Sequence, residues 1–165
     1  MSNTQTEIKV IIEIAMNSDP IKYEIDKDSG MLMVDRFMNT AMRYPANYGY
    51  IPDTLAQDGD PLDVLLICAY PLIPGCLIKA RPIGVLMMED ESGTDEKILA
   101  LPALKTDPSY SHIVDIGDLD ESQLAKIKHF FEHYKDLDKS KWVKVQDWQG
   151  AAKAVELISK YQLNK

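Results

Sequence analysis

The sequence predicts a mainly β protein of the α+β class, in which a small closed barrel of strands is flanked by two main C-terminal helices. Short segments with β-branched or alternating apolar residues fill the first two thirds of the chain. Proline, glycine and acidic turns separate these segments. In the last third the hydrophobic period changes to that of a helix. Short strands followed by helices are typical of a closed or nearly closed barrel with helices packed against it.

Six segments have the character of strands. The first, Lys9–Ile14, is short and rich in β-branched residues. The next, Ile21–Ile25, alternates strictly, with apolar side chains on one face and Lys22 and Glu24 on the other. The tyrosine-rich stretch 43–53 shows no strand period. The four remaining strand segments are Met31–Phe37, Asp63–Tyr70, Ile78–Met88 and Lys97–Ala103.

Two helices are expected in the last third of the chain. Apolar residues recur at helical spacing from Leu119 to Leu137, with acidic residues leading and lysines following, as the helix dipole favours. A short extended segment, Lys141–Val145, precedes a second helix near Ala151–Leu163. The chain has no internal repeat, low-complexity tract or flexible linker, so we expect residues 1–165 to form a single domain.

Composition and charge exclude several classes of protein. Of the 165 residues, 45% are hydrophobic and 27% are charged, which is typical of a globular domain. Eighteen basic residues against 26 acidic ones give a net charge of -8. Proteins that bind nucleic acids usually carry a basic field, so we expect no nucleic-acid partner.

Neither the start of the chain nor its apolar runs suggest export or a membrane. The first residues lack a basic region followed by an apolar stretch, so we expect no secretory signal. The longest uncharged stretch, Val64–Ile78, is too short to span a bilayer. Cys68 and Cys76 form no C-x-x-C pair, and we expect both to be buried thiols in a reducing compartment. We therefore expect a cytoplasmic protein.

Three aspartates, Asp58, Asp60 and Asp63, crowd together at the start of an apolar segment. Carboxylates crowded in this way raise one another's pKa unless a cation lies among them, and their oxygens suit Mg²⁺ or Mn²⁺. A calcium loop is disfavoured, because Leu62 stands at its fifth position and an aspartate replaces the glycine of its sixth. The alternative to a metal site is a solvated turn before a strand.

A second acidic segment, Met88–Lys97, lies between two strand segments and is expected to be a hairpin loop. An acidic loop by itself is usually only a soluble surface feature. If this loop met the aspartate cluster, Asp90 and Asp95 could complete a site for several metal ions. The sequence does not show whether the two segments meet.

Basic and phenolic residues gather on strand-like segments and in the tyrosine-rich stretch. Their hydroxyl and guanidinium groups suit phosphate oxygens. They are Lys22, Arg36, Arg43, Tyr44, Tyr48 and Tyr50. The alternative for each residue alone is an ordinary half-buried tyrosine or a surface charge.

A stretch near the end of the first helix contains His129, Glu132 and His133 and matches an inverted zinc-protease motif. We reject a zinc protease, because no other part of the chain resembles a peptidase. We expect the two histidines to mark a helix face that contacts a neighbour. Tyr134 and Lys135 add a further phenol and a further ammonium group.

Taken together, these segments resemble the soluble family I inorganic pyrophosphatases of the bacterial type. The stretch "DGDPLDV" is similar to the family signature D-x-D-P-x-D followed by an apolar residue. The likeness extends to "MEDESGTDEK" and "HFFEHYKDL". The resemblance implies a five-stranded OB-type barrel with flanking helices, assembled as a homohexamer. It also implies that inorganic pyrophosphate is hydrolysed to two orthophosphates, with several Mg²⁺ ions at each active site and Mn²⁺ as a possible substitute.

The resemblance also implies roles for the acidic residues. Asp58, Asp63 and Asp95 would hold the activating metal ions, with Asp63 bridging two of them. Asp90, together with Asp95, would meet a metal that arrives with the substrate. Asp60 would accept the proton of the attacking water.

Further roles follow from the same resemblance. One group of residues would hold the phosphates, with Lys97 nearby; its members are Lys22, Arg36, Tyr48, Tyr134 and Lys135. Glu13 and Glu24 would line the cavity. Ala15 stands where many relatives have proline, which affects no expected ligand. Two other functions stay open: hydrolysis of another phosphoanhydride, such as a nucleotide or short polyphosphate, and a barrel that only binds oligonucleotides or proteins.

Overall fold

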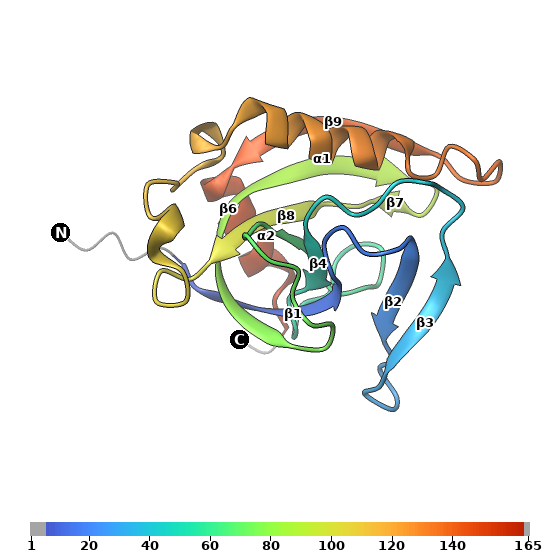
Figure 1. The fold of residues 1–165 in the computed structure, drawn as a ribbon, viewed down its shortest axis with the longest axis horizontal. Coiled ribbons are helices and arrows are strands. Elements are labelled where there is room, and N and C mark those ends of the chain that lie inside the picture. Colours follow the sequence, from blue (N-terminus) through green and yellow to red (C-terminus); the bar gives the residue numbers. More distant parts are fainter. Residues whose placement is uncertain (1–5, 164–165) are drawn as a thin grey trace.

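A computed structural model describes residues 6–163. Residues 1–5, which are the first part of the start where we expect no secretory signal, and residues 164–165 lie outside the described part. Five strands form a closed ring in the order β1-β4-β5-β8-β6 and back to β1 (Figure 1). They are β1 (Ile8–Ile14), β4 (Asn47–Tyr50), β5 (Asp63–Leu66), β8 (Lys97–Pro102) and β6 (Leu77–Asp90). The expected five-stranded closed barrel is therefore confirmed.

Strand β6 is long enough to join four other strands. Its first half pairs with β1, which closes the ring, and its middle pairs with β8. Its far end turns back into β7 (Gly93–Thr94), so the expected acidic hairpin is present. Residues Gly84–Asp90 of β6 also pair with β9 (Val143–Gly150). Strand β9 is longer than the short extended segment expected there.

The ring is antiparallel except at one pair of strands that matters for the site. Strands β5 and β8 run parallel, and Asp63 at the start of β5 lies opposite Lys97 at the start of β8. Both side chains therefore emerge at the same edge of the barrel.

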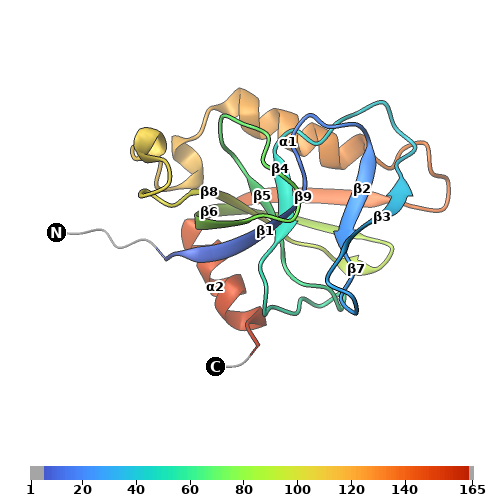
Figure 2. The ribbon, with the colours of Figure 1, turned by 60° about the horizontal axis from the view of Figure 1, so that its bottom comes forward.

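Two helices cover opposite faces of these strands (Figures 1 and 2). Helix α1 (Glu121–His133) packs on the cluster that contains Leu65 and Leu99, and α2 (Ala151–Tyr161) packs on the cluster that contains Val64 and Ile98. Neighbouring residues of a strand point to opposite faces. Because one helix or core cluster covers each face, these strands carry apolar side chains on both faces. This explains why the segments are nearly continuous apolar runs in the sequence.

Two carboxylates fix the starts of the helices. The Asp120 side chain accepts a hydrogen bond from the Ser122 amide at the start of α1. Asp115, remote in sequence, accepts a hydrogen bond of 2.9 Å from the Ala151 amide at the start of α2. Helix α2 ends at Tyr161, two residues before the expected end. No helix in residues 6–163 has both the length and the apolar character needed to cross a membrane.

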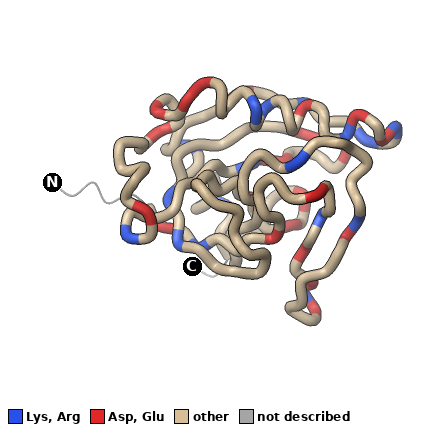
Figure 3. The backbone as a smooth tube through the Cα atoms, viewed as in Figure 1, with Lys and Arg blue, Asp and Glu red and all other residues tan. Residues whose placement is uncertain are grey.

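A hairpin of β2 (Ile21–Ile25) and β3 (Leu32–Phe37) forms a separate two-stranded sheet beside the barrel (Figures 1 and 2). Lys22 lies opposite Arg36 across this hairpin. Acidic and basic residues are interspersed on the hairpin and on the barrel (Figure 3). Charges of both signs are therefore found on the hairpin as well as on the barrel.

Strand β4 lies in the stretch where no strand was expected. Its Gly49 crosses the backbone of β1 so closely that a Cβ atom there would lie 1.8 Å from the carbonyl oxygen of Ile11. Only glycine permits this approach. The sequence period is lost because both faces of β4 are buried and one position needs no side chain.

Candidate active site

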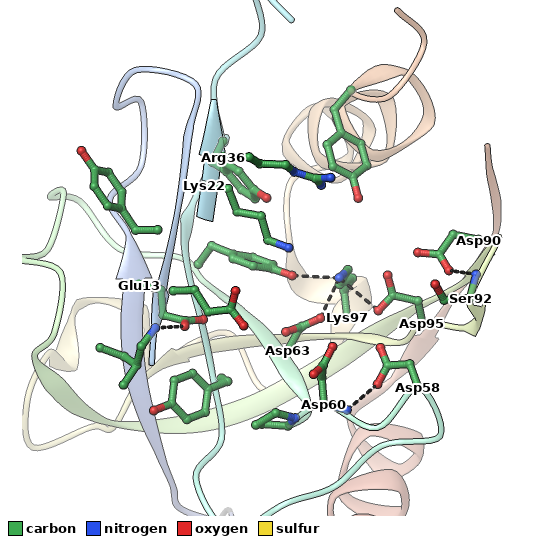
Figure 4. Close-up of a pocket in the computed structure, with 18 of the residues that line it drawn as sticks. Glu13, Lys22, Arg36, Asp58, Asp60, Asp63, Asp90, Ser92, Asp95 and Lys97 are labelled. Atoms are coloured by element: carbon green, nitrogen blue, oxygen red, sulfur yellow. Dashed lines mark hydrogen bonds and ion pairs between the residues drawn. The ribbon is translucent and has the colours of Figure 1, made fainter. Parts of the chain in front are cut away.

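A cleft of about 560 Å³ lies between the β2–β3 hairpin, the open edge of the barrel and the end of α1. Every residue to which the resemblance gives a role lines this one cleft. These residues are Glu13, Lys22, Glu24, Arg36, Tyr48, Asp58, Asp60, Asp63, Asp90, Asp95, Lys97, Tyr134 and Lys135. Figure 4 shows Lys22 pointing from the hairpin toward the carboxylates on the barrel side, with Arg36 extending across the cleft above it. The placement brings these residues together, while the role of each one stays a prediction.

The two acidic segments meet around Lys97. Its Nζ donates hydrogen bonds of 2.7 Å to Asp63 Oδ2 and 2.8 Å to the Tyr48 hydroxyl, and it lies 3.1 Å from Asp95 Oδ1 (Figure 4). Asp63 comes from the aspartate cluster and Asp95 from the hairpin loop. One ammonium group therefore bridges the two segments, which the sequence could not show.

Lys97 stays charged although it is buried. Burial lowers the pKa of its ammonium group, but Asp63, Tyr48 and Asp95 outweigh this effect, and the pKa is raised well above its usual value. The ammonium also lies 5.3 Å from the ring centroid of Tyr48 and 5.7 Å from that of Phe131. Its positive charge is thus held by carboxylates and by aromatic faces.

The carboxylates around Lys97 repel one another. Burial, and then the charges of Asp95, Asp63 and Asp60, raise the pKa of Asp58, although its Oδ1 accepts a hydrogen bond of 3.0 Å from the Asp60 amide. Burial also raises the pKa of Asp95, with Lys97 acting against the rise and Asp63 adding to it. Additional positive charge among these groups would therefore be stabilising.

This set of oxygen donors fits hard divalent cations such as Mg²⁺ by its chemistry and its crowding. In the described part of the chain, however, no three acidic, histidine or cysteine side chains already surround a common point as metal ligands. Instead, Lys97 lies between Asp63 and Asp95. A metal ion that bound there would have to share or replace the role of this ammonium group.

A second lysine connects the end of α1 to the hairpin loop. Lys135 Nζ lies 3.2 Å from Asp90 Oδ2 and 3.7 Å from Glu91 Oε1. Burial lowers the pKa of Lys135, but Tyr134 and Asp90 raise it by more, so the ammonium stays charged. The neighbouring Tyr134 ring stacks on Phe130, with centroids 5.1 Å apart. A cation and a phenol are therefore fixed at the far wall of the cleft.

Glu13 lies where the pairing of β1 with β4 shifts register, in an irregularity of the kind that redirects side chains. Its Oε2 accepts a hydrogen bond of 2.8 Å from the Ile25 amide and so ties the barrel to the hairpin. Burial is the main reason why the pKa of Glu13 is raised to about 7, and the Ile25 hydrogen bond only partly offsets it.

We expect Glu13→Gln to remove part of the pH dependence of stability in metal-free protein. Glu13 is 8% exposed, and its pKa rises from an ordinary value of 4.5 in the unfolded chain to about 7 in the folded protein. Its contribution is therefore complete below pH 4.5 and is lost as pH rises through 7. Between pH 5 and pH 8 the wild type should lose up to about 3 kcal/mol more than the variant, at about 1.4 kcal/mol per pKa unit.

Urea unfolding in chelator at both pH values measures this difference. The glutamine oxygen can still accept the Ile25 hydrogen bond, so packing changes little. An equal loss of unfolding free energy in both proteins would contradict the raised pKa.

Some residues in the cleft were not in the predicted set. Tyr44 and Tyr50, noted for their phenols, line it, and so does Lys141 from the segment that was expected only to be extended. Tyr44 is buried and packs between the rings of Tyr48 and Phe130, with centroids 4.8 and 4.7 Å away. The sequence pattern gives no sign of this position of Lys141, because it depends on the path of the loop after α1.

His129 and His133 are exposed on α1 and do not line the cleft. Their rings lie 4.7 Å apart, and His133 Nδ1 lies 2.8 Å from Asp136 Oδ2. The expected contact of this face with a neighbour stays a prediction.

Comparisons with known proteins agree with this geometry. The profile of the family described as inorganic pyrophosphatase matches residues 10–164. The chain is 62% identical over 152 residues to an inorganic pyrophosphatase of Rickettsia prowazekii, covering 92% of this chain and 88% of that protein. It is 57% identical over 160 residues to an inorganic pyrophosphatase of Escherichia coli K12, covering 96% and 91%.

Solved structures show the same fold. A crystal structure described as an inorganic phosphatase from Anaplasma phagocytophilum superposes with a TM-score of 0.93 at 53% identity, covering 98% of this chain and 94% of that one. An inorganic pyrophosphatase from Helicobacter pylori gives 0.92 at 50% identity, covering 97% and 94%. The sequence, the ring of strands and these similarities agree, and the chain belongs to the inorganic pyrophosphatase family.

Proposed function

We propose that this protein hydrolyses inorganic pyrophosphate to two orthophosphates, with Mg²⁺ as its cofactor and Mn²⁺ as a possible substitute. The observation that carries the proposal is the convergence of two acidic segments and a set of basic and phenolic groups in one cleft. Pyrophosphate is a small, densely charged anion, and a site for it must supply positive charge from several directions.

The basic groups can hold both phosphates. Lys22 and Arg36 reach the cleft from the hairpin, and Lys135 reaches it from the end of α1. Guanidinium and ammonium groups bind phosphate oxygens by charge-assisted hydrogen bonds. The hydroxyls of Tyr48 and Tyr134 add neutral donors, because burial raises both pKa values and keeps the phenols protonated. These local groups allow an anion to bind although the chain carries a net charge of -8.

The acidic groups divide into ligands and a base. Asp58, Asp63, Asp90 and Asp95 would hold the metal ions. When bound, Mg²⁺ neutralises negative charge in the site and makes a coordinated water more acidic. Lys97 supports the ligands, because it orients Asp63 and Asp95 toward each other.

Asp60 suits the role of proton acceptor. Its side chain is mostly exposed, and the ion pair described for it is a long one of 3.9 Å to Lys27. Gly59 before it adopts a positive φ of 87°, a conformation that places Asp60 beside the cleft and that few other residues adopt. A carboxylate that is not spent on coordinating a metal ion can take a proton from water. Glu13 and Glu24 line the remaining wall.

Release of orthophosphate from two substrates tests the proposal. With Mg²⁺ present, the protein should hydrolyse pyrophosphate much faster than ATP, because the proposed site is built for an anion of two phosphate groups. Faster release from ATP would instead favour the hydrolysis of another phosphoanhydride. Binding of an oligonucleotide without any hydrolysis would favour a binding module.

Three further features belong to the same proposal. We propose that residues 1–165 act as one domain, that the chain forms a homohexamer and that it works in the cytoplasm. The resemblance to bacterial family members supports all three. The sedimented mass of the purified protein tests the hexamer.

A further inference from the structure

The last residue of α2, Tyr161, is bonded to both acidic segments although it lies outside the cleft. Its carbonyl oxygen accepts a hydrogen bond of 2.9 Å from the Leu55 amide. Its hydroxyl donates a hydrogen bond of 3.0 Å to Glu96 Oε1. Tyr161 and Glu96 are both buried, so the bond between their side chains is shielded from water. One residue thus joins two segments that are far apart in the chain.

The first bond reaches the segment that carries the aspartate cluster. The Ala56 amide, next to Leu55, donates a hydrogen bond of 2.8 Å to the carbonyl oxygen of Asp60. The Leu163 amide donates another, also of 2.8 Å, to the carbonyl oxygen of Asp53. The end of α2 therefore fixes the start of the loop that presents Asp58 and Asp60.

The second bond reaches the segment that carries Asp95 and Lys97. Glu96 lies between these two residues, but it contacts α2 instead of lining the cleft. It is 4% exposed, and its second oxygen, Oε2, has no hydrogen-bond partner among the described residues. The Tyr161 hydroxyl is thus the one hydrogen-bond partner described for this buried carboxyl group. A buried polar group that loses its hydrogen-bond partner lowers the stability of the fold. The bond to Tyr161 therefore favours the backbone position of Glu96 that keeps it.

We propose that Tyr161, acting through Glu96, is a positioning residue that sets the spacing between the Asp58–Asp63 segment and Asp95. Cation ligands must be held to within about 0.5 Å by the groups behind them. Loss of such outer partners typically weakens metal binding 10- to 100-fold. This inference rests on the proposed function, because it assumes that the two acidic segments bind Mg²⁺ together.

The test is calorimetric titration of Mg²⁺ into chelator-treated full-length protein without substrate. Tyr161→Phe removes only the hydroxyl, and we expect it to weaken Mg²⁺ binding about tenfold, the lower end of the outer-partner range. Glu96→Leu removes the acceptor and should have a similar effect. Glu96→Gln keeps an acceptor oxygen for the hydroxyl and should change the affinity by less than about threefold.

Tyr110→Phe is the matched control, because it removes a phenol hydroxyl from a partly buried tyrosine that does not line the cleft. It should bind Mg²⁺ like the wild type. Urea unfolding of each metal-free variant measures whether the fold is kept. A Tyr161→Phe protein that loses stability but binds Mg²⁺ as tightly as the wild type would show a merely structural role and overturn the inference. So would a Glu96→Gln protein that is as weak as Glu96→Leu.

The outcome for the wild type separates the two proposals. If the wild type neither binds Mg²⁺ nor hydrolyses pyrophosphate, the proposed function fails. If it does both, and Tyr161→Phe and Glu96→Leu bind Mg²⁺ normally, only the positioning role fails.

Discussion

Asp60→Asn is expected to lower the turnover of pyrophosphate by roughly two to four powers of ten, the usual scale for the loss of a general base. The amide keeps the size and shape of the carboxylate but cannot take a proton from water. Asp60 is mostly exposed and forms one long ion pair, so the substitution should cost little stability. Steady-state hydrolysis at saturating Mg²⁺ measures the effect.

The matched control for this substitution is Asp147→Asn, which removes an exposed carboxylate on β9 that does not line the cleft. Its turnover should stay close to that of the wild type. Near-normal turnover of Asp60→Asn with Mg²⁺ would remove Asp60 from the role of base. An unchanged turnover together with a raised KM would instead indicate that Asp60 only helps the substrate to bind.

Asp63→Ala should weaken Mg²⁺ binding by at least one to two powers of ten. Loss of a residue that only hydrogen-bonds to a metal ligand already weakens metal binding by about this much, and Asp63 is assigned as a ligand itself. The change also leaves the buried Lys97 ammonium with Asp95 as its remaining carboxylate partner. Uncompensated charge in a buried site is costly, so the metal-free protein should also lose stability. Titration of Mg²⁺ followed by calorimetry measures the first effect, and urea unfolding measures the second.

Asp147→Ala serves as the control, because it also removes one negative charge from the chain. A general electrostatic effect would weaken Mg²⁺ binding in both variants alike, whereas a ligand role weakens it only in Asp63→Ala. Unchanged Mg²⁺ dependence of hydrolysis in Asp63→Ala would count against the assignment of Asp63 as a bridging ligand.

The strands and the helices could be predicted from the sequence where their apolar pattern is periodic. The alternation of Ile21–Ile25 identifies β2, and the spacing of Leu124, Ile127 and Phe130 identifies α1. Strand β4 could not be found in this way, because Gly49 is there for close packing against Ile11 and carries no hydrophobic signal. A strand cannot be predicted from hydrophobic periodicity where tertiary packing determines the residue type.

The residues that line the cleft could be predicted, but not how they are connected. The aspartate motif places Asp58, Asp60 and Asp63 together by their proximity in the chain. That Asp95 meets them depends on the parallel pairing of β5 with β8, which is a property of the closed ring. The same pairing makes Lys97 the centre of the charge network, whereas the resemblance placed it only near the phosphates.

Tyr161 shows the same limit at longer range. In the sequence it is one of several apolar or aromatic residues in a C-terminal helix. Its hydroxyl bond to Glu96 spans 65 positions of the chain and becomes visible only when α2 is packed on the barrel. A residue in such a supporting position has no sequence motif, because its partner is distant in the chain and is brought to it only by the tertiary fold.

We propose that divalent cations, held by carboxylates from two segments, allow water to cleave a small doubly phosphorylated anion in this cleft. Orthophosphate release from pyrophosphate by the purified, folded protein tests it most directly, first with ample Mg²⁺ and then with an excess of chelator. We predict rapid release with Mg²⁺, loss of release with chelator and recovery when Mg²⁺ is restored. Pyrophosphate that stays intact at ample Mg²⁺, or release that continues unchanged in chelator, would contradict the claim.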